Sequence, residues 1–267
     1  MAGNTKALRI RIKSVNSTLQ LTKAMELVAT SKIRRANEGM QNAREYTEAL
    51  EKSVSLLTSE KECLKSPYMR KTDSPKTKII VIAGDRGLAG GYNSNVFRLC
   101  SEYPDAEFIP IGKRACEKFE KEPNSSEHFS FSDASVLAEE LCKDFREEKF
   151  DRLGVIYTKY VSVMSCEAKI KWLLPFEKTE NDSAASAIFE PDHLTVLNLT
   201  VKEYVAGILI ACLRESFACE VASRRIAMDS AGKNAKQMLD DLGLRYNRAR
   251  QGAITQEITE IVAGSGN

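Results

Sequence analysis

Features that would point to catalytic or metal chemistry are scarce in this sequence of 267 residues. It has only two histidines, His128 and His193, which lie far apart in the chain and fit no metal-ligand spacing. The seven cysteines form no Cys-x-x-Cys pair, so they predict neither a zinc site nor a dithiol switch. We therefore expect reduced, mostly buried cysteines, no catalytic residues, no metal and no cofactor.

Long apolar runs are also missing. The longest, from Tyr204 to Leu213, is too short to span a bilayer, and the N-terminus lacks the apolar core of a signal peptide. The 39 basic and 37 acidic residues leave a formal net charge of +2, which gives no indication of nucleic-acid binding. We expect a soluble, cytoplasmic chain with no transmembrane segment and no nucleic-acid partner.

The N-terminal end of the chain is predicted to be one long helix. No Gly or Pro occurs from Asn4 to Glu38, and apolar side chains recur there every three or four residues. The later part of the stripe has the heptad spacing of a coiled coil. Its members are Leu8, Ile12, Val15 and Leu19, then Ala36, Met40, Ala43, Thr47, Leu50, Val54 and Leu57. A helix over residues 5–57 would be about 80 Å long, more than a domain of this size can bury.

The C-terminal end, residues 201–262, has a second helical stripe. Its members are Val205, Leu209, Cys212, Ser216, Cys219, Ser223 and Ile226, then Ala231, Ala235, Met238, Leu242, Ala249 and Ala253. Small side chains bury little area, so the second half of this helix should be stabilised by pairing with another element. Gly232, Gly243 and Gly252 each weaken an exposed helix by about 1 kcal/mol, and bends could occur there. The alternative is a four-helix bundle in which both ends fold back on themselves.

The middle of the chain alternates between short apolar runs and helical stretches. The expected strands are Lys78 to Ala83, Glu107 to Ile111, Leu153 to Tyr157 and Cys166 to Leu174. The expected helices are Tyr92 to Ser101, Lys113 to Lys121 and Ala134 to Glu147. This alternation predicts an α/β domain with some parallel strand pairing. We predict three regions: an N-terminal coiled-coil helix at 1–58, an α/β domain at 76–178 and a C-terminal coiled-coil helix at 200–264.

A glycine-rich loop follows the first expected strand. It contains Gly84, Asp85, Arg86, Gly87, Gly90 and Gly91. Phosphate-binding loops occur at this place in α/β folds, but the spacing is not Gly-x-Gly-x-x-Gly and no Lys-Ser/Thr follows. The pattern favours a tight strand-to-helix turn over a nucleotide site. Asp85 and Arg86 could pair within the turn or contact a partner.

Both terminal helices carry positive charge. The segment from Lys6 to Arg35 has eight basic residues and one acidic residue, a local net charge of 8 − 1 = +7. Such a helix favours an acidic partner. Three arginines between Arg245 and Arg250 precede an apolar helix end, which indicates that a partner covers it.

Three blocks of the sequence carry a resemblance to a known family. They are residues 9–14 with 21–36, the loop from Gly84 to Asn93, and the segment from Ala227 to Val262. In these blocks the chain resembles the gamma subunit of the rotary (F-type) ATP synthase, of bacterial type. The resemblance covers both terminal helices and is weaker from about Cys100 to Leu199.

The resemblance implies a fold and a set of partners. The long N- and C-terminal helices would form an antiparallel coiled coil within a ring of alpha and beta subunits. The middle would form a Rossmann-like α/β foot domain that meets the epsilon subunit and the membrane rotor ring. The complex would be peripheral, at the cytoplasmic face of the bacterial plasma membrane.

The resemblance also implies contact residues. Those facing the beta subunits would be Met25, Lys32, Arg34, Arg35, Arg250, Gln251 and Thr255. An apolar tip that turns in an apolar sleeve would consist of Ile254, Ile258 and Ile261.

The implied function is a non-catalytic central rotor stalk of a proton- or sodium-translocating ATP synthase. It would couple ion-driven rotation to the conformational cycling of the catalytic beta subunits. Two alternatives remain at this point: a coiled-coil adaptor that joins an acidic partner to a small α/β module, and an α/β hydrolase or nucleotide-binding enzyme with helical extensions.

Overall fold

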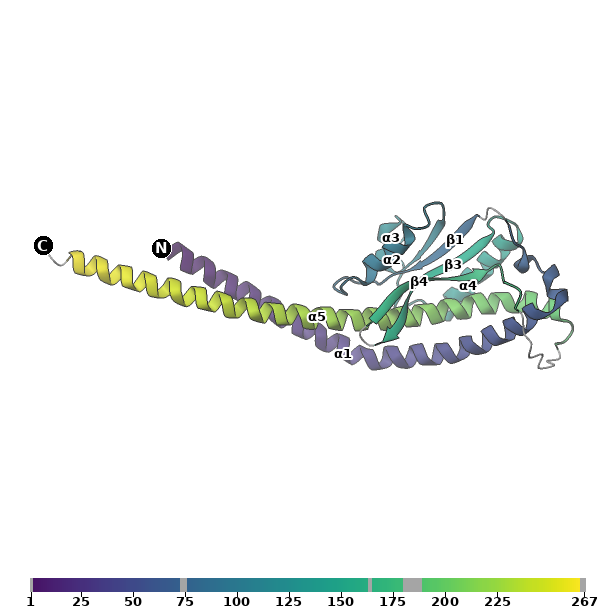
Figure 1. Cartoon of the computed structure of the whole chain (residues 1–267), viewed down its shortest axis with the longest axis horizontal. Coiled ribbons are helices and arrows are strands. Elements are labelled where there is room, and N and C mark those ends of the chain that lie inside the picture. Colours follow the sequence, from purple (N-terminus) through teal and green to yellow (C-terminus); the bar gives the residue numbers. More distant parts are fainter. Residues whose placement is uncertain (1, 73–75, 163–164, 180–188, 265–267) are drawn as a thin grey trace. The chain divides into compact units, whose positions relative to one another are not determined.

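The computed structural model describes residues 2–72, 76–162, 165–179 and 189–264 (Figure 1). The chain divides into two compact units. Residues 1–30 and 224–267 make up the helical unit, and residues 31–223 make up the sheet unit. Two helices, α1 (Ala2–Ser59) and α5 (His193–Gly264), contribute to both units.

Both terminal helices are uninterrupted. α1 has 58 residues and α5 has 72, which correspond to lengths of about 90 Å and about 110 Å. Gly232, Gly243 and Gly252 all lie within α5 without ending it. α5 begins eight residues before the expected start at 201, because Asp192 caps it. The Asp192 carboxylate accepts hydrogen bonds from the backbone N–H and the hydroxyl of Thr195, at 2.8 Å each.

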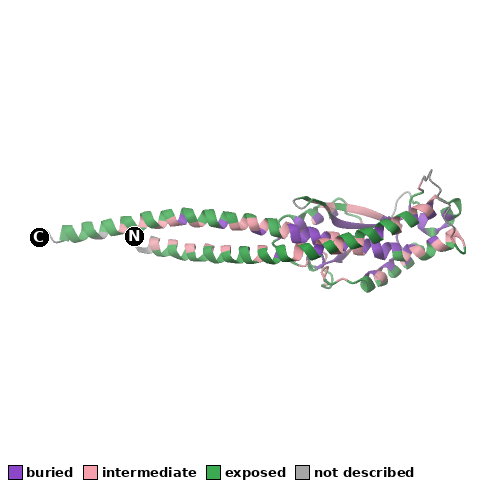
Figure 2. Cartoon of the chain, turned by 90° about the horizontal axis from the view of Figure 1, so that it is seen from below, coloured by how far each residue is buried: buried purple, intermediate pink, exposed green. Residues whose placement is uncertain are grey.

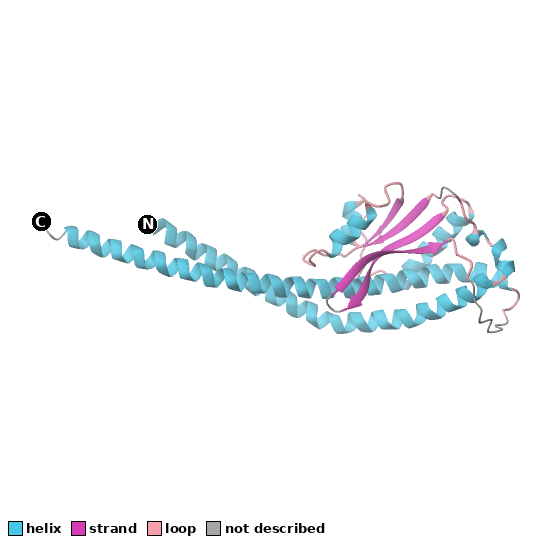
Figure 3. Ribbon diagram, in the orientation of Figure 1, coloured by secondary structure: helices cyan, strands magenta, loops and turns pink. Residues whose placement is uncertain are grey.

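The sheet unit is built on four strands, in the order β2-β1-β3-β4 (Figure 3). Their bounds are β1 (Thr77–Ile82), β2 (Glu107–Ile111), β3 (Arg152–Ser162) and β4 (Ser165–Leu174). β1 pairs in parallel with both β2 and β3, and β4 pairs antiparallel with β3. The four expected strands are confirmed, with β3 extending five residues beyond its expected end at Tyr157.

Helices cover both faces of this sheet. The shorter ones are α2 (Tyr92–Cys100), α3 (Lys113–Lys118) and α4 (Phe131–Arg146), with the 3-10 turns η1 (Lys61–Lys65) and η2 (Pro67–Met69). A capping box begins α4, in which Ser130 and Asp133 each bond the other's backbone N–H. This cap explains why α4 begins three residues before the expected start at Ala134.

Alternate residues of the central strands point into two separate apolar layers. Ile79 and Val81 of β1 pack with α2 and α3 residues such as Val96 and Ala115. Ile80 and Ile82 point to the opposite face, into a larger layer formed with α1, α4 and α5. Buried residues are concentrated in the sheet unit (Figure 2). The sheet therefore separates two apolar cores, and α5 packs in the larger core.

Within the sheet unit, α1 and α5 approach each other closely at Gly207. A Cβ atom placed on Gly207 would lie 2.6 Å from Cδ1 of Leu50 and 3.0 Å from Cε1 of Tyr46. Only glycine permits this approach without movement of the neighbouring side chains. Lys171 of β4 also forms an ion pair with Glu51 of α1, so the edge of the sheet is joined to the helix.

The helical unit is held by fewer and smaller side chains. Thr22 and Ala29 of α1 are buried, as are Met228, Ala235 and Leu242 of α5. On each helix these positions are seven residues apart. A Cβ placed on Gly232 would lie 3.5 Å from Oγ1 of Thr22, an ordinary contact, so the two helices lie against each other there.

One detail of the expected C-terminal stripe is wrong. Ile226 and Met238 are 40% and 44% exposed, whereas Met228, which was outside the stripe, is 5% exposed. The apolar pattern alone could not identify the face of α5 that meets α1, because small and apolar residues occur on several faces of this segment. The N-terminal stripe is confirmed from Ala36 to Leu57, with every member buried or half-buried.

α5 contains one stretch that is long and apolar enough to cross a membrane by composition. However, 56% of that 18-residue window is buried inside the protein, which is typical of the core helix of a domain.

Six of the seven cysteines are buried, Cys166 is half-buried, and all are free, in agreement with the expectation. No group of three or more metal-ligating side chains occurs in the part of the chain that the structure describes.

Candidate partner-binding surfaces

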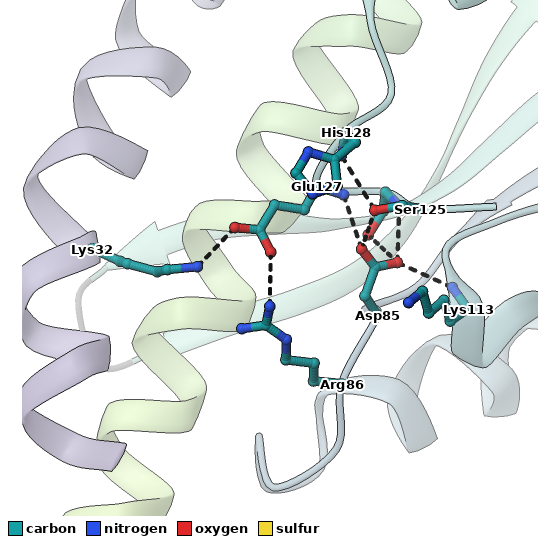
Figure 4. Close-up of polar contacts among 8 residues, drawn as sticks. Lys32, Asp85, Arg86, Lys113, Ser125, Glu127 and His128 are labelled. Atoms are coloured by element: carbon teal, nitrogen blue, oxygen red, sulfur yellow. Dashed lines mark hydrogen bonds and ion pairs between the residues drawn. The ribbon is translucent and has the colours of Figure 1, made fainter. Parts of the chain in front are cut away.

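The glycine-rich loop is organised by Asp85 (Figure 4). Its carboxylate accepts hydrogen bonds from the backbone N–H groups of Lys113, Ser126 and Glu127 at 3.1, 2.9 and 3.2 Å. It also accepts one from the Ser125 hydroxyl at 2.5 Å. Burial alone would raise the pKa of Asp85, but these hydrogen bonds outweigh it and lower the pKa below its ordinary value. Asp85 therefore joins the loop to the start of α3 and to the segment before α4.

Glu127 links the loop to α1. Figure 4 shows its carboxylate between Lys32 of α1 and Arg86 of the loop, with N–O distances of 2.7 and 3.6 Å. The hydrogen bond from Lys32, helped by the charges of Lys32 and Arg86, holds the pKa of Glu127 below its ordinary value despite partial burial. Lys32, which was predicted to face a beta subunit, and Arg86, for which an ion pair and a partner contact were both left open, are thus partly neutralised within the chain.

The loop also packs closely on α5. A Cβ placed on Gly84 would lie 2.7 Å from Cδ of Glu220, whose side chain is buried. Ala89 and Tyr92 pack with Cys219 on the same turn of α5. Burial and the nearby Glu220 carboxylate raise the pKa of the Tyr92 hydroxyl. The close packing of the loop on α5 is therefore a reason for glycine at position 84.

Strand β3 is joined to the same part of α5. β1 pairs with β3 only as far as Ile156, so the backbone N–H groups further along that edge of β3 are not bonded to β1. Side chains of α5 take this place: the Thr158 N–H donates to Oγ of Ser216 at 3.0 Å, and the Tyr160 N–H donates to Oε1 of Glu215 at 2.9 Å. We call α5 residues 215–220, with their contacts to the loop and β3, the sheet–helix joint.

Sequence reasoning did not identify the sheet–helix joint. Ser216 was assigned only to an apolar stripe, and Glu215 and Glu220 were not singled out. The sequence does contain an indication of this joint, because Glu220 is the one charged residue between Phe217 and Ala222. A carboxylate in such an apolar run needs a hydrogen-bonding partner in the fold, and this could have marked the position.

A groove of about 750 Å³ lies beside the loop within the sheet unit. It is lined by Lys32, Arg35 and Gly39 of α1, Glu127 and His128 of the segment before α4, and Arg214 and Phe217 of α5. Arg34 forms a 2.9 Å ion pair with Glu38. Within the described ranges, neither Arg35 nor Arg214 forms an ion pair. These two exposed guanidinium groups add positive charge to the groove.

The predicted contact residues of the helical unit lie on exposed or half-exposed surface. Met25 is half-buried, and Arg250, Gln251 and Thr255 are exposed on α5. The Thr255 hydroxyl donates a hydrogen bond to the Gln251 carbonyl oxygen at 2.9 Å. In the part of the unit that the structure describes, Arg250 has no acidic partner. Ile254, Ile258 and Ile261 are 47%, 56% and 70% exposed, so this end of α5 presents apolar side chains at its surface.

Comparison with known proteins identifies the family. The family model described as ATP synthase matches residues 4–266. A protein of Ruminococcus albus, named ATP synthase gamma chain, is 39% identical over 99% of this chain and 98% of its own length. The chain belongs to the ATP synthase gamma chain family.

Further relatives of this gamma chain family support the assignment. A protein of Acetobacterium woodii, named ATP synthase gamma chain, sodium ion specific, is 34% identical over 99% of both chains. A chain of the Euglena gracilis mitochondrial ATP synthase has a TM-score of 0.71 at 19% identity, covering 99% of this chain and 94% of its own. A chain from a Tetrahymena thermophila structure described as central stalk and c-ring has a TM-score of 0.62 at 23% identity, covering 79% of this chain and 99% of its own. At these identities the two structures support the fold alone.

Proposed function

We propose that this gamma chain is the non-catalytic central stalk of an ion-translocating ATP synthase and couples rotation to the conformational cycle of catalytic beta subunits. The observation that carries the proposal is the full-length relationship to gamma chains, over residues 4–266. The structure supports it with two uninterrupted terminal helices of 58 and 72 residues. An adaptor or an enzyme with helical extensions gives no reason for a family match over the whole chain.

The two helices of the helical unit serve as an antiparallel coiled coil. Supporting this, the buried positions Thr22 and Ala29 on one helix, and Met228, Ala235 and Leu242 on the other, keep a spacing of seven residues. Two helices wound together resist torsion better than one. The proposed regions are the coiled-coil helices at 1–58 and 200–264 and the foot domain at 76–178.

The foot domain, Rossmann-like in its parallel strands and flanking helices, contacts the epsilon subunit and the membrane rotor ring. The alpha and beta subunits surround the coiled coil. In this arrangement the chain is peripheral, at the cytoplasmic face of the bacterial plasma membrane, and needs no membrane span of its own. The buried position of the apolar stretch of α5 supports this last point.

The basic residues of the terminal helices contact acidic groups of the beta subunits. Arg35 and Arg250 are best suited, because both are exposed and neither has an acidic partner in the described part of the chain. Lys32 and Arg34 contribute less, because Glu127 and Glu38 already neutralise them. Gln251, Thr255 and Met25 complete this surface, and Ile254, Ile258 and Ile261 turn in an apolar sleeve.

Such a stalk acts on the catalytic ring because the stalk itself is asymmetric. A single rod in a three-fold ring presents a different face to each beta subunit, so the three nucleotide sites have different contact free energies and favour different conformations. Rotation of the rod exchanges those states among the three sites. The chain needs no chemistry of its own for this role.

Purification of the assembled complex tests the proposal. A tagged chain, expressed with the other synthase subunits of its source, should recover alpha and beta subunits at one tagged copy per ring. Recovery of the isolated monomer alone would contradict the stalk assignment.

A variant tests the assigned contact. Arg250→Ala should leave ring recovery unchanged and reduce the number of ions pumped per ATP, because it removes one guanidinium from the interface. Arg225→Ala, which changes another exposed arginine of α5, is the matched control and should pump like the wild type. Equal pumping by wild type and Arg250→Ala would remove Arg250 from the proposed surface.

A further inference from the structure

Two cysteines that are distant in sequence meet at the sheet–helix joint. Cys166 lies on the edge strand β4 and packs against the cluster that contains Cys219 of α5. The two thiols are hydrogen-bonded, with the Cys219 S–H donating to the Cys166 sulfur, and the Ser223 hydroxyl donates to the same sulfur. The sequence predicted no dithiol switch because it shows no Cys-x-x-Cys, but the fold brings together cysteines 53 positions apart in a chain whose cysteines are all free.

The two sulfurs differ in exposure and acidity. Cys166 is half-buried, whereas Cys219 is fully buried. The hydrogen bond from Cys219 lowers the pKa of Cys166 despite burial, whereas the same bond and then burial raise the pKa of Cys219. By contrast, burial raises the pKa of Cys100 and Cys142 to about 11 and that of Cys212 to about 12. Cys166 is therefore both the more acidic and the more exposed thiol of the two, the combination that favours the attacking cysteine of a pair.

We propose that Cys166 and Cys219 form a reversible disulfide that fastens the edge strand β4 to helix α5 when the chain meets a small-molecule disulfide oxidant. The proposal does not rest on rotation, so its failure would leave the stalk assignment untouched. It adds a redox-sensitive connection to a joint that otherwise consists of hydrogen bonds from β3 backbone N–H groups to Glu215 and Ser216 and of the packing of the glycine loop on Glu220.

The chemistry proceeds in two exchange steps. The Cys166 thiolate attacks one sulfur of the oxidant, forming a mixed disulfide and releasing the first oxidant thiolate, which takes up a proton. The Cys219 sulfur then attacks the Cys166 sulfur, loses its proton and releases the second oxidant thiolate, which is protonated in turn. Two protein thiols are oxidised to one disulfide, and one oxidant disulfide is reduced to two thiols. After the first step Cys166 no longer accepts the hydrogen bond that raised the pKa of Cys219, so the resolving thiol becomes easier to deprotonate.

The test uses the reduced full-length chain and oxidised glutathione. Remaining thiols are alkylated, the chain is digested without reductant, and the peptides are identified by mass spectrometry. We expect two of the seven thiols to be lost, both in one joined peptide that contains Cys166 and Cys219, and dithiothreitol to restore them. Retention of all seven thiols, or a mixture of other joined peptides from folded protein, would overturn the proposal.

Single variants separate the two roles. Cys219→Ala should trap glutathione on Cys166, and Cys166→Ala should leave every remaining thiol reduced. Cys100→Ala changes a buried cysteine of α2 outside the pair and should still form the disulfide. Cys166 is half-buried, so its alanine variant is expected to fold even where Cys219→Ala does not. Glutathione on any other cysteine of Cys166→Ala would show that Cys166 is not the reactive thiol.

Two further measurements distinguish a reactive pair from simple packing. Alkylation of Cys166 should continue to lower pH in the wild type than in Cys219→Ala, because the variant lacks the hydrogen bond that lowers the Cys166 pKa. The oxidised wild type should unfold several degrees higher than the reduced form, because the disulfide closes a loop of 53 residues in the unfolded chain. An unchanged pH profile together with an unchanged unfolding temperature would contradict the proposal.

Discussion

In the sheet unit α5 presents many large apolar side chains to a core of several elements, whereas in the helical unit only Met228, Ala235 and Leu242 of its described residues are buried. Leu197, Val201, Leu209 and their neighbours are fully buried between the sheet and α1. Beyond residue 243, none of the α5 residues whose burial the structure describes is buried, and four large apolar side chains near the end of the helix are exposed. The difference shows that the sheet unit is stabilised by its own core, whereas the end of α5 leaves apolar surface exposed, as the proposed partner contact would need.

Removal of a large core side chain should give the largest effect. Phe145 is fully buried and packs against the rings of Tyr68 and Phe150, with centroid distances of 5.8 and 5.5 Å. Phe145→Ala should lower the free energy of unfolding by about 3–5 kcal/mol, as measured by chemical denaturation.

Leu242→Ala in the helical unit is the matched comparison. It should leave the main unfolding transition unchanged, because Leu242 belongs to the helical unit and is not a member of the apolar core of the sheet unit. Loss of stability as large as that of Phe145→Ala would show that the two units unfold together, and the contrast drawn above would be wrong.

A smaller effect is expected at the sheet–helix joint. Gly84→Ala would place a Cβ 2.7 Å from the buried Glu220 carboxylate and should destabilise the chain by about 1–3 kcal/mol. Gly91→Ala in the same loop, whose Cβ would come no nearer than 3.6 Å to a neighbouring atom, should be nearly neutral. Combining Gly84→Ala with Glu220→Ala should give a loss smaller than the sum of the two single losses. Additive losses would mean that Gly84 and Glu220 do not interact.

The smallest effect should depend on pH. Asp85→Asn removes the charge of the carboxylate that accepts several backbone hydrogen bonds. It should lower the free energy of unfolding by about 1–2 kcal/mol at pH 7. Because the folded-state pKa of Asp85 is lowered, its contribution is present above the unfolded pKa of about 3.9 and is lost as pH falls through the lower folded value. Unfolding free energies of wild type and variant should therefore converge below about pH 4.

The control for this titration is Asp105→Asn, which changes an exposed carboxylate. Its difference from wild type should stay small and constant across the same pH range. If Asp85→Asn and Asp105→Asn behaved alike, the hydrogen bonds of Asp85 would contribute no net stability to the loop.

Much of the fold could be predicted from local pattern. β2 occupies the predicted residues, and α2 ends within one residue of its predicted end, because short apolar runs and turn residues mark these limits clearly. The starts of α4 and α5 were missed because their caps, Ser130 with Asp133 and Asp192 with Thr195, lie before the apolar stripe on which the prediction relied. The face of α5 in the helical unit was partly wrong because small residues give a weak stripe.

The candidate site was less predictable than the fold. The exposed apolar helix end and the exposed Arg250 follow from sequence, because helical spacing alone leaves them without a partner in the chain. The pairing of Lys32 and Arg86 with Glu127 does not follow, because it joins residues up to 95 positions apart.

By itself the sequence determined two long terminal helices, the alternating α/β middle and the positive charge of the N-terminal helix, since each depends on residues that are near neighbours in the chain. Only the tertiary structure decided which groups meet: the Gly84 backbone with Glu220, the β3 amides with Glu215 and Ser216, and the thiol of Cys166 with that of Cys219. These contacts depend on how the sheet packs on α5, and packing is set by the shape and volume of many side chains together rather than by the spacing of any few of them.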